Sequence, residues 1–189
     1  MATSFDDMIF AILDSQRESN AAVIRGEVVP TSLESPVTIR CVIRGIRYND
    51  GFAQELHGRP ELPQVTRALN ARALMSNRGV PKMDRPEEIP YCFWHPDVPS
   101  EQTLQQLLEA YPENTLLRYQ IGRACAAGGY TDLYHTLGLL PEVAIAEEAR
   151  DNSHSGKAIY DAIMNAPSLW TYMDDYNCCL REKQSLGLF

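Results

Sequence analysis

The side chains most often used in catalysis and metal binding are spread thinly through this sequence. No two histidines have the i, i+4 spacing that places both imidazoles on one helix face for zinc; they are His57, His95, His135 and His154. The five cysteines include no Cys-x-x-Cys pair. We therefore expect no metal site and no cofactor, and we interpret the cysteines as reduced thiols in the core. A Cys–His nucleophilic pair that meets only in the folded chain stays open as an alternative.

The segment from Tyr91 to Asp97 has the most unusual local composition, Tyr-Cys-Phe-Trp-His-Pro-Asp between two prolines. Aromatic residues on a projecting loop make good binding anchors because they offer large contact area at small entropic cost. We predict a binding role for Tyr91, Trp94, His95 and Asp97. The alternative is that the rings of this segment cover the core instead of projecting from it.

Arginine dominates the basic residues and concentrates in the middle of the chain. Fourteen of the seventeen basic residues are arginine, and eight of these lie between Arg40 and Arg85. Arg40, Arg44 and Arg47 recur at helical spacing, and their guanidinium groups could bind a carboxylate or phosphate. The alternative is pairing with acidic residues of the same chain. Because the net charge is −8, we expect no nucleic-acid binding.

Apolar periodicity and capping residues predict helices through both halves of the chain. For residues 36–48 a strand is the rival interpretation, since β-branched residues are frequent there. The prolines at positions 81, 86 and 90 mark residues 81–99 as a connection between an N-terminal segment, 1–80, and C-terminal hairpins, 100–189, within one continuous structural domain. The expected helices cover residues 4–19, 21–26, 36–48, 62–76, 101–111, 115–127, 133–140, 143–150, 158–165 and 168–181.

The stretch from Ile121 to Tyr134 resembles the helix–turn–helix of an ankyrin repeat. Cys125-Ala126 stand for its small inner-helix pair, Gly129-Tyr130 for its turn, and Asp132-Leu133-Tyr134 for the start of its outer helix. A fainter echo follows at residues 156–163, so the similarity covers about residues 114–165, with another degenerate copy at 35–46. No unit carries the full Thr-Pro-Leu-His signature. The resemblance implies an all-α fold of ankyrin-like helical hairpins; an irregular helical bundle is the alternative.

These observations lead to three hypotheses of function. The first is a non-catalytic protein–protein interaction module that contacts another protein through residues 91–97 and the turn that bears Tyr130 and Asp132. The second is a small enzyme or ligand-binding protein with an arginine-lined anion pocket. The third, a homo-oligomer, is suggested by the apolar end of the chain, residues 186–189. Without a long apolar run or a basic leader, we expect no membrane contact and an intracellular location, cytoplasmic or nuclear.

Overall fold

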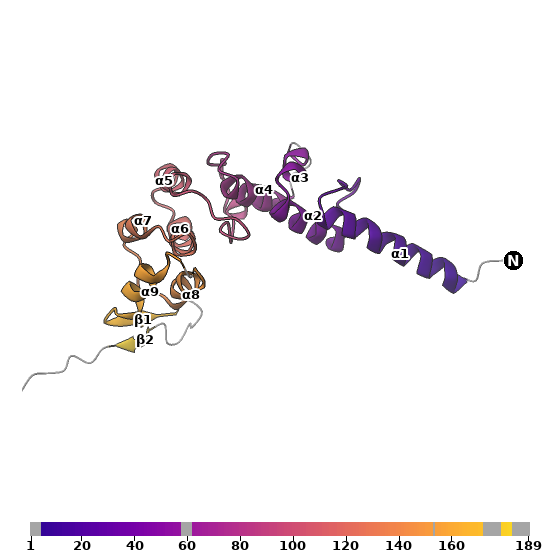
Figure 1. The fold of residues 1–189 in the computed structure, drawn as a ribbon. Coiled ribbons are helices and arrows are strands. Elements are labelled where there is room, and N and C mark those ends of the chain that lie inside the picture. The colour runs from indigo at the N-terminus through magenta and orange to yellow at the C-terminus, as the bar shows by residue number, and fades with distance from the viewer. Residues whose placement is uncertain (1–4, 58–61, 153, 172–178, 183–189) are drawn as a thin grey trace, which may run out of the picture. The chain divides into compact units, whose positions relative to one another are not determined.

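The computed structural model describes residues 5–57, 62–152, 154–171 and 179–182, with the backbone alone for residues 5–12 and 179–182. The chain divides into two compact units (Figure 1). Unit 1 comprises Met1–Ala73 and Lys82–Pro90, and unit 2 comprises Leu74–Pro81 and Tyr91–Phe189. The placement of domain boundaries at residues 80 and 99 stays a prediction.

Helices dominate the described residues, which confirms the all-α expectation at the level of fold class. The described elements are α1 (Phe5–Ile24), α2 (Pro36–Tyr48), α3 (Asp50–Glu55), α4 (Pro63–Met75), the 3-10 turn η1 (Pro86–Glu88), α5 (Glu101–Ala110), α6 (Thr115–Gly128), α7 (Thr131–Thr136), α8 (Val143–Asp151), α9 (Lys157–Met164), β1 (Ser168–Trp170) and β2 (Cys179–Glu182). No helix in the described part of the chain has the length and apolar character needed to cross a bilayer.

In unit 1, α2 packs against α1 and α3. Its apolar stripe is buried at Val42 and Ile46, while Arg40 and Arg44 on the same helix are exposed. The helical interpretation of residues 36–48 is therefore confirmed, because apolar steps of three and four bury one side of a helix. The buried core of unit 1 consists of Val23, Cys41, Val42, Ile46, Phe52, Ala53, Leu56 and Val65.

In unit 2, α8 packs along both α6 and α9, and α6 also contacts α5 and α7. The predicted caps are confirmed at two helices: the Ser100 hydroxyl accepts from Thr103 N–H at 3.2 Å, and Asn114 Oδ1 accepts from Leu117 N–H at 3.0 Å. At the end of α6, Gly129 takes a left-handed conformation with φ 75°, which glycine adopts without strain.

Three element predictions are corrected. The helix expected over residues 168–181 is wrong within the described residues, where β1 and β2 pair antiparallel; Trp170 N–H donates to Pro141 O at 2.8 Å, so a tertiary contact fixes this segment as a strand. The helix expected to reach Leu140 ends at Thr136, before the left-handed Gly138. One helix, α1, replaces the two expected up to Gly26. Ser4, the expected cap of the first helix, lies outside the described residues.

The repeat arrangement implied by the ankyrin resemblance stays a prediction. The first hairpin is present as α6, the Gly129 turn and α7, with Cys125 and Ala126 buried on α6. The second echo forms α9, which packs on α8 and α7.

Candidate functional site

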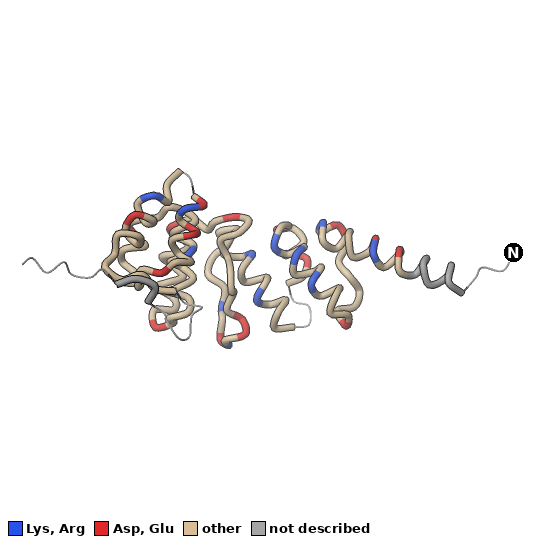
Figure 2. The backbone as a smooth tube through the Cα atoms, turned by 90° about the horizontal axis from the view of Figure 1, so that it is seen from below, with Lys and Arg blue, Asp and Glu red and all other residues tan. Residues whose placement is uncertain are grey.

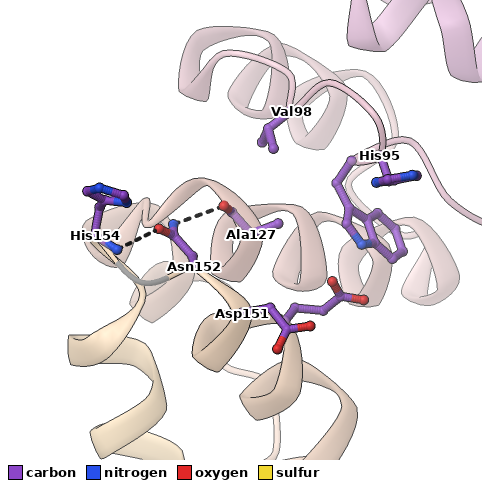
Figure 3. A pocket seen from close by; sticks show the side chains of 8 residues that line it. His95, Val98, Ala127, Asp151, Asn152 and His154 are labelled. Atoms are coloured by element: carbon purple, nitrogen blue, oxygen red, sulfur yellow. Dashed lines mark hydrogen bonds between the residues drawn. The ribbon is translucent and has the colours of Figure 1, made fainter. Parts of the chain in front are cut away.

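An open hollow of about 320 Å³ lies on unit 2, where three segments distant in sequence meet. These segments are the loop before α5, the last turn of α6, and the turn from α8 to α9. Figure 3 shows His95 and His154 at opposite ends of this hollow. We call it the α6–α8 groove; its lining residues are Trp94, His95, Val98, Ala127, Glu148, Asp151, Asn152 and His154.

Trp94 anchors one wall of the groove and is 6% exposed. The Arg123 guanidinium carbon lies 4.8 Å from the centre of its ring, a cation–π distance. Arg123 also pairs with the Glu148 carboxylate at 2.5 Å. These two contacts, from Trp94 to Arg123 and from Arg123 to Glu148, therefore join the loop before α5 to α6 and α8.

Asn152 fixes the opposite wall. Its side-chain amide donates to the Ala127 carbonyl at 2.9 Å, and its Oδ1 accepts from the backbone N–H groups of His154 and Ser155, each at 3.2 Å. The first two of these bonds are drawn in Figure 3. An Asx turn of this kind sets the path of the chain after α8, so the position of His154 is defined by the end of α6.

The two carboxylates of the groove differ in their surroundings. Glu148 is compensated by Arg123, whereas the Asp151 side chain is 76% exposed and pairs at 3.7 Å with Arg150, whose side chain is 61% exposed. Exposed pairs of this length contribute little energy. Asp151 can therefore exchange Arg150 for the cationic side chain of a ligand, while the imidazoles offer further donors and acceptors.

The groove lacks the signs of a metal or thiol centre. Over the described residues, no group of three or more His, Cys, Asp or Glu side chains is placed to hold a metal ion. Burial raises the pKa of the Cys125 thiol to about 12, and the Glu101 charge adds to this effect. Cys125 thus stays protonated at neutral pH and cannot act as a thiolate nucleophile.

The structure separates the predicted binding residues. Trp94 and His95 line the α6–α8 groove, while Tyr91 is 66% exposed and does not line it. Asp97 and Asp132 are exposed as well, and the peptide bond between His95 and Pro96 is cis. Residues 91–97 therefore combine the two interpretations of this segment. Trp94 is buried in the core, whereas Tyr91, His95 and Asp97 are exposed.

Tyr130 supports the loop instead of lining the groove. Its hydroxyl donates to Pro99 O at 3.0 Å, and burial, followed by the Glu101 charge, raises its pKa. This bond ties the α6–α7 turn to the segment that carries Trp94 and His95.

The predicted anion-binding arginines lie on α2 in unit 1, where basic residues recur along the helices (Figure 2). Arg40 and Arg44 are exposed, and the Arg44 guanidinium carbon lies 5.1 Å from the centre of the Tyr48 ring. Arg47 is half-buried, and its carbonyl accepts from Arg72 at 2.9 Å. None of the three lines the α6–α8 groove.

Sequence reasoning missed Asp151, Asn152 and His154 as site residues. The signal was present in the polar run of residues 151–155 directly after a helix, which is typical of a turn. Nothing in the sequence indicated that this turn meets the end of α6, since Asn152 and Ala127 are 25 residues apart.

The comparisons with known proteins bear on the same part of the chain. Neither the curated proteins nor the solved structures include a match to this sequence. Residues 94–184 match the family model described as the YKP1 C-terminal domain, a stretch that begins at Trp94 and includes every lining residue of the α6–α8 groove.

Proposed function

We propose that unit 2 is a non-catalytic protein-interaction module whose α6–α8 groove binds an extended, basic segment of another protein. The observation that carries the proposal is the composition of the groove. A tryptophan ring, two imidazoles and the exposed Asp151 carboxylate surround one open hollow. Sites of this kind hold a partner through an apolar and aromatic lining and a few well-placed polar contacts.

The form of the groove favours binding over catalysis. It is open, and its two imidazoles lie at opposite ends, while Val98 and Ala127 are apolar lining residues. The buried Cys125 is protonated at neutral pH. An extended peptide needs such an accessible surface, whereas catalysis usually requires groups that converge in a water-excluded pocket.

The charge of unit 2 favours a basic partner. Unit 2 carries thirteen acidic residues against seven basic ones. Such an excess attracts a cationic segment and speeds its association, and salt weakens the effect. Asp151 is the groove carboxylate most open to that segment.

The ankyrin resemblance supports the same class of function. The α6–α7 hairpin and its left-handed Gly129 turn are the features that the resemblance rests on. Ankyrin-type hairpins present their surfaces to other proteins, so an interaction role agrees with both lines of argument.

A peptide-library selection against the full chain tests the proposal. We expect peptides enriched in Lys and Arg, with binding that weakens as salt rises from 50 to 500 mM. His95→Ala should weaken the selected peptides several-fold without a change in melting temperature, because the exposed imidazole lines the groove. Calorimetric titration measures both effects.

The proposal would be contradicted if the selected peptides were not enriched in Lys and Arg. It would also be contradicted if their affinity changed neither with salt nor with His95→Ala. The anion-binding hypothesis gives a different result. There, inorganic phosphate or citrate would raise the melting temperature, and Arg44→Ala would abolish the increase.

A further inference from the structure

Two sets of arginines in unit 1 differ in their surroundings. The first set pairs with carboxylates of the same unit and consists of Arg25, Arg72 and Arg85. The second set is exposed on α1 and α2 and makes no ion pair with a described acidic residue; it consists of Arg17, Arg40 and Arg44. The guanidinium groups of the second set therefore offer their charge to a partner of the chain.

The exposed face of α2 carries two of these arginines between an apolar and an aromatic side chain. The four side chains recur at helical spacing and so share one side of α2; they are Val37, Arg40, Arg44 and Tyr48. Val37 is 56% exposed and Tyr48 is 43% exposed. The Arg44 guanidinium lies over the Tyr48 ring, which orders the cation and leaves its charge in place.

A groove between α1 and the start of α2 adjoins this face. Its volume is about 650 Å³, and Val37 belongs both to its lining and to the exposed face of α2. Among the described residues that line the groove, Arg17 is the one charged side chain, and the apolar Leu13 is 54% exposed. Thr38 Oγ1 donates to Asn20 Oδ1 at 3.4 Å, so the two helices are joined beside the groove. We call groove and face together the α1–α2 surface; its exposed residues include Leu13, Arg17, Val37, Arg40, Arg44 and Tyr48.

The composition of the α1–α2 surface indicates the chemistry of its partner. Leu13 and Val37 favour apolar side chains, because their burial removes exposed apolar area from water. The guanidinium groups favour carboxylates, with which arginine forms paired hydrogen bonds. An amphipathic helix with Asp or Glu beside its apolar stripe supplies both, and such helices bind in grooves through their apolar side.

The neighbouring charges disfavour a long polyanion. Asp14 and Glu18 are exposed on α1 next to Arg17, and neither lines the groove. A nucleic acid or an anionic membrane spreads its charge over a wide area and would meet these carboxylates as well. A single helix can place its carboxylates at the arginines alone.

We propose that the α1–α2 surface of unit 1 binds an acidic amphipathic helix of another protein. The apolar stripe of this helix packs on Leu13 and Val37, and its carboxylates pair with Arg17, Arg40 and Arg44. Arg17 thus takes the place that the sequence gave to Arg47, which is half-buried. The proposal is independent of the α6–α8 groove, which lies in unit 2 and attracts the opposite charge.

Selection of helical peptides from an amphipathic library against the full chain tests the proposal. We expect a family of peptides with Asp or Glu beside a stripe of Leu, Ile or Phe. Arg40→Glu should weaken these peptides about tenfold or more, because an attraction becomes a repulsion. Arg25→Glu is the matched control and should weaken them less than about threefold. It changes the charge of unit 1 equally, whereas Arg25 pairs with Glu27 and lies outside the groove lining.

Val37→Asp tests the apolar part of the surface. An acidic residue in the first turn of α2 agrees with the helix dipole, so the variant should fold. It should weaken the acidic peptides about tenfold or more, because it removes an apolar contact and adds a like charge. Far-UV circular dichroism and the unchanged binding of a Lys/Arg-rich peptide to unit 2 check that the chain is intact.

Three results would overturn the proposal. The first is a selection without acidic peptides. The second is an equal loss of affinity in Arg40→Glu and Arg25→Glu, or no loss in Val37→Asp. The third is tighter binding of poly-uridine RNA or of phosphatidylserine vesicles than of the peptides, with a loss in Arg40→Glu, which would assign the surface to a polyanion instead.

Discussion

At the scale of single residues, the structure assigns opposite roles to glycines that look alike in the sequence. Gly45 lies inside α2, where an added Cβ would come within 2.5 Å of the Val23 carbonyl oxygen and 2.8 Å of the Phe52 ring. Gly51 lies in α3, where an added Cβ would meet nothing within 4 Å. The absence of a side chain is therefore required at Gly45 and incidental at Gly51.

Gly45→Ala should destabilise the protein by about 1–3 kcal/mol, because overpacking at the α1–α2 contact outweighs the gain in helix propensity. Gly51→Ala is the control and should stabilise α3 by up to about 1 kcal/mol. Chemical denaturation of both variants measures the difference. Two substitutions with the same sign would show that α1 and α2 do not pack at this distance.

Trp94 is the second residue whose role depends on burial. It combines the features of a binding anchor with 6% exposure and a stacked Arg123. Trp94→Ala should therefore cost about 3–5 kcal/mol of stability, in the range of large-to-small core substitutions. A shift in melting temperature of a degree or two or less would contradict the core position. His95 and Asp151 are thus better probes of binding than Trp94.

At the scale of elements, the sequence predicted helices well where a cap and a periodic stripe coincide. Helices α5 and α6 begin at their predicted caps, Ser100 and Asn114. The prediction failed at β1, where a bond from Trp170 to Pro141 stabilises a strand. The role of Glu142 was not predicted either: its side chain caps α8 and accepts a hydrogen bond from the Tyr119 hydroxyl. Such tertiary partners leave no local signal in the sequence.

Two buried groups of helices α6 and α7 also make unit 2 less stable at alkaline pH. The pKa of Cys125 is raised to about 12 by burial, and that of Tyr134 in α7 is raised to about 12 for the same reason. In the unfolded chain the thiol ionises near pH 8.5, so between about pH 9 and 12 the unfolded state binds fewer protons than the native state. The contribution of the protonated thiol to the stability of unit 2 is thus fully present below about pH 8.5 and is lost as the pH rises toward the native pKa of about 12.

We expect Cys125 alone to contribute a loss of up to about 1.4 kcal/mol per pH unit in this range. Denaturant unfolding at pH 8, 9, 10 and 11 measures the slope, and Cys125→Ala should make it shallower. An unchanged slope in Cys125→Ala would mean that the thiol ionises equally in both states.

At the scale of the whole molecule, the proposed interaction surface belongs to one of the two compact units. All lining residues of the α6–α8 groove lie in unit 2. The sequence indicated Trp94 and His95 as binding residues, but it could not show that residues 151–154 meet them. That arrangement depends on the packing of α8 along α6, which brings residues far apart in the sequence to one surface.

The affinity of a selected Lys/Arg-rich peptide for two charge-reversed variants tests the central claim most directly. Asp151 lines the α6–α8 groove, whereas Asp132 is exposed on α7 of the same unit and does not. Both substitutions, Asp151→Lys and Asp132→Lys, change the net charge of unit 2 equally. The account predicts at least a tenfold loss of affinity for Asp151→Lys and a loss of less than threefold for Asp132→Lys. Equal losses, or a larger loss for Asp132→Lys, would contradict binding in the groove.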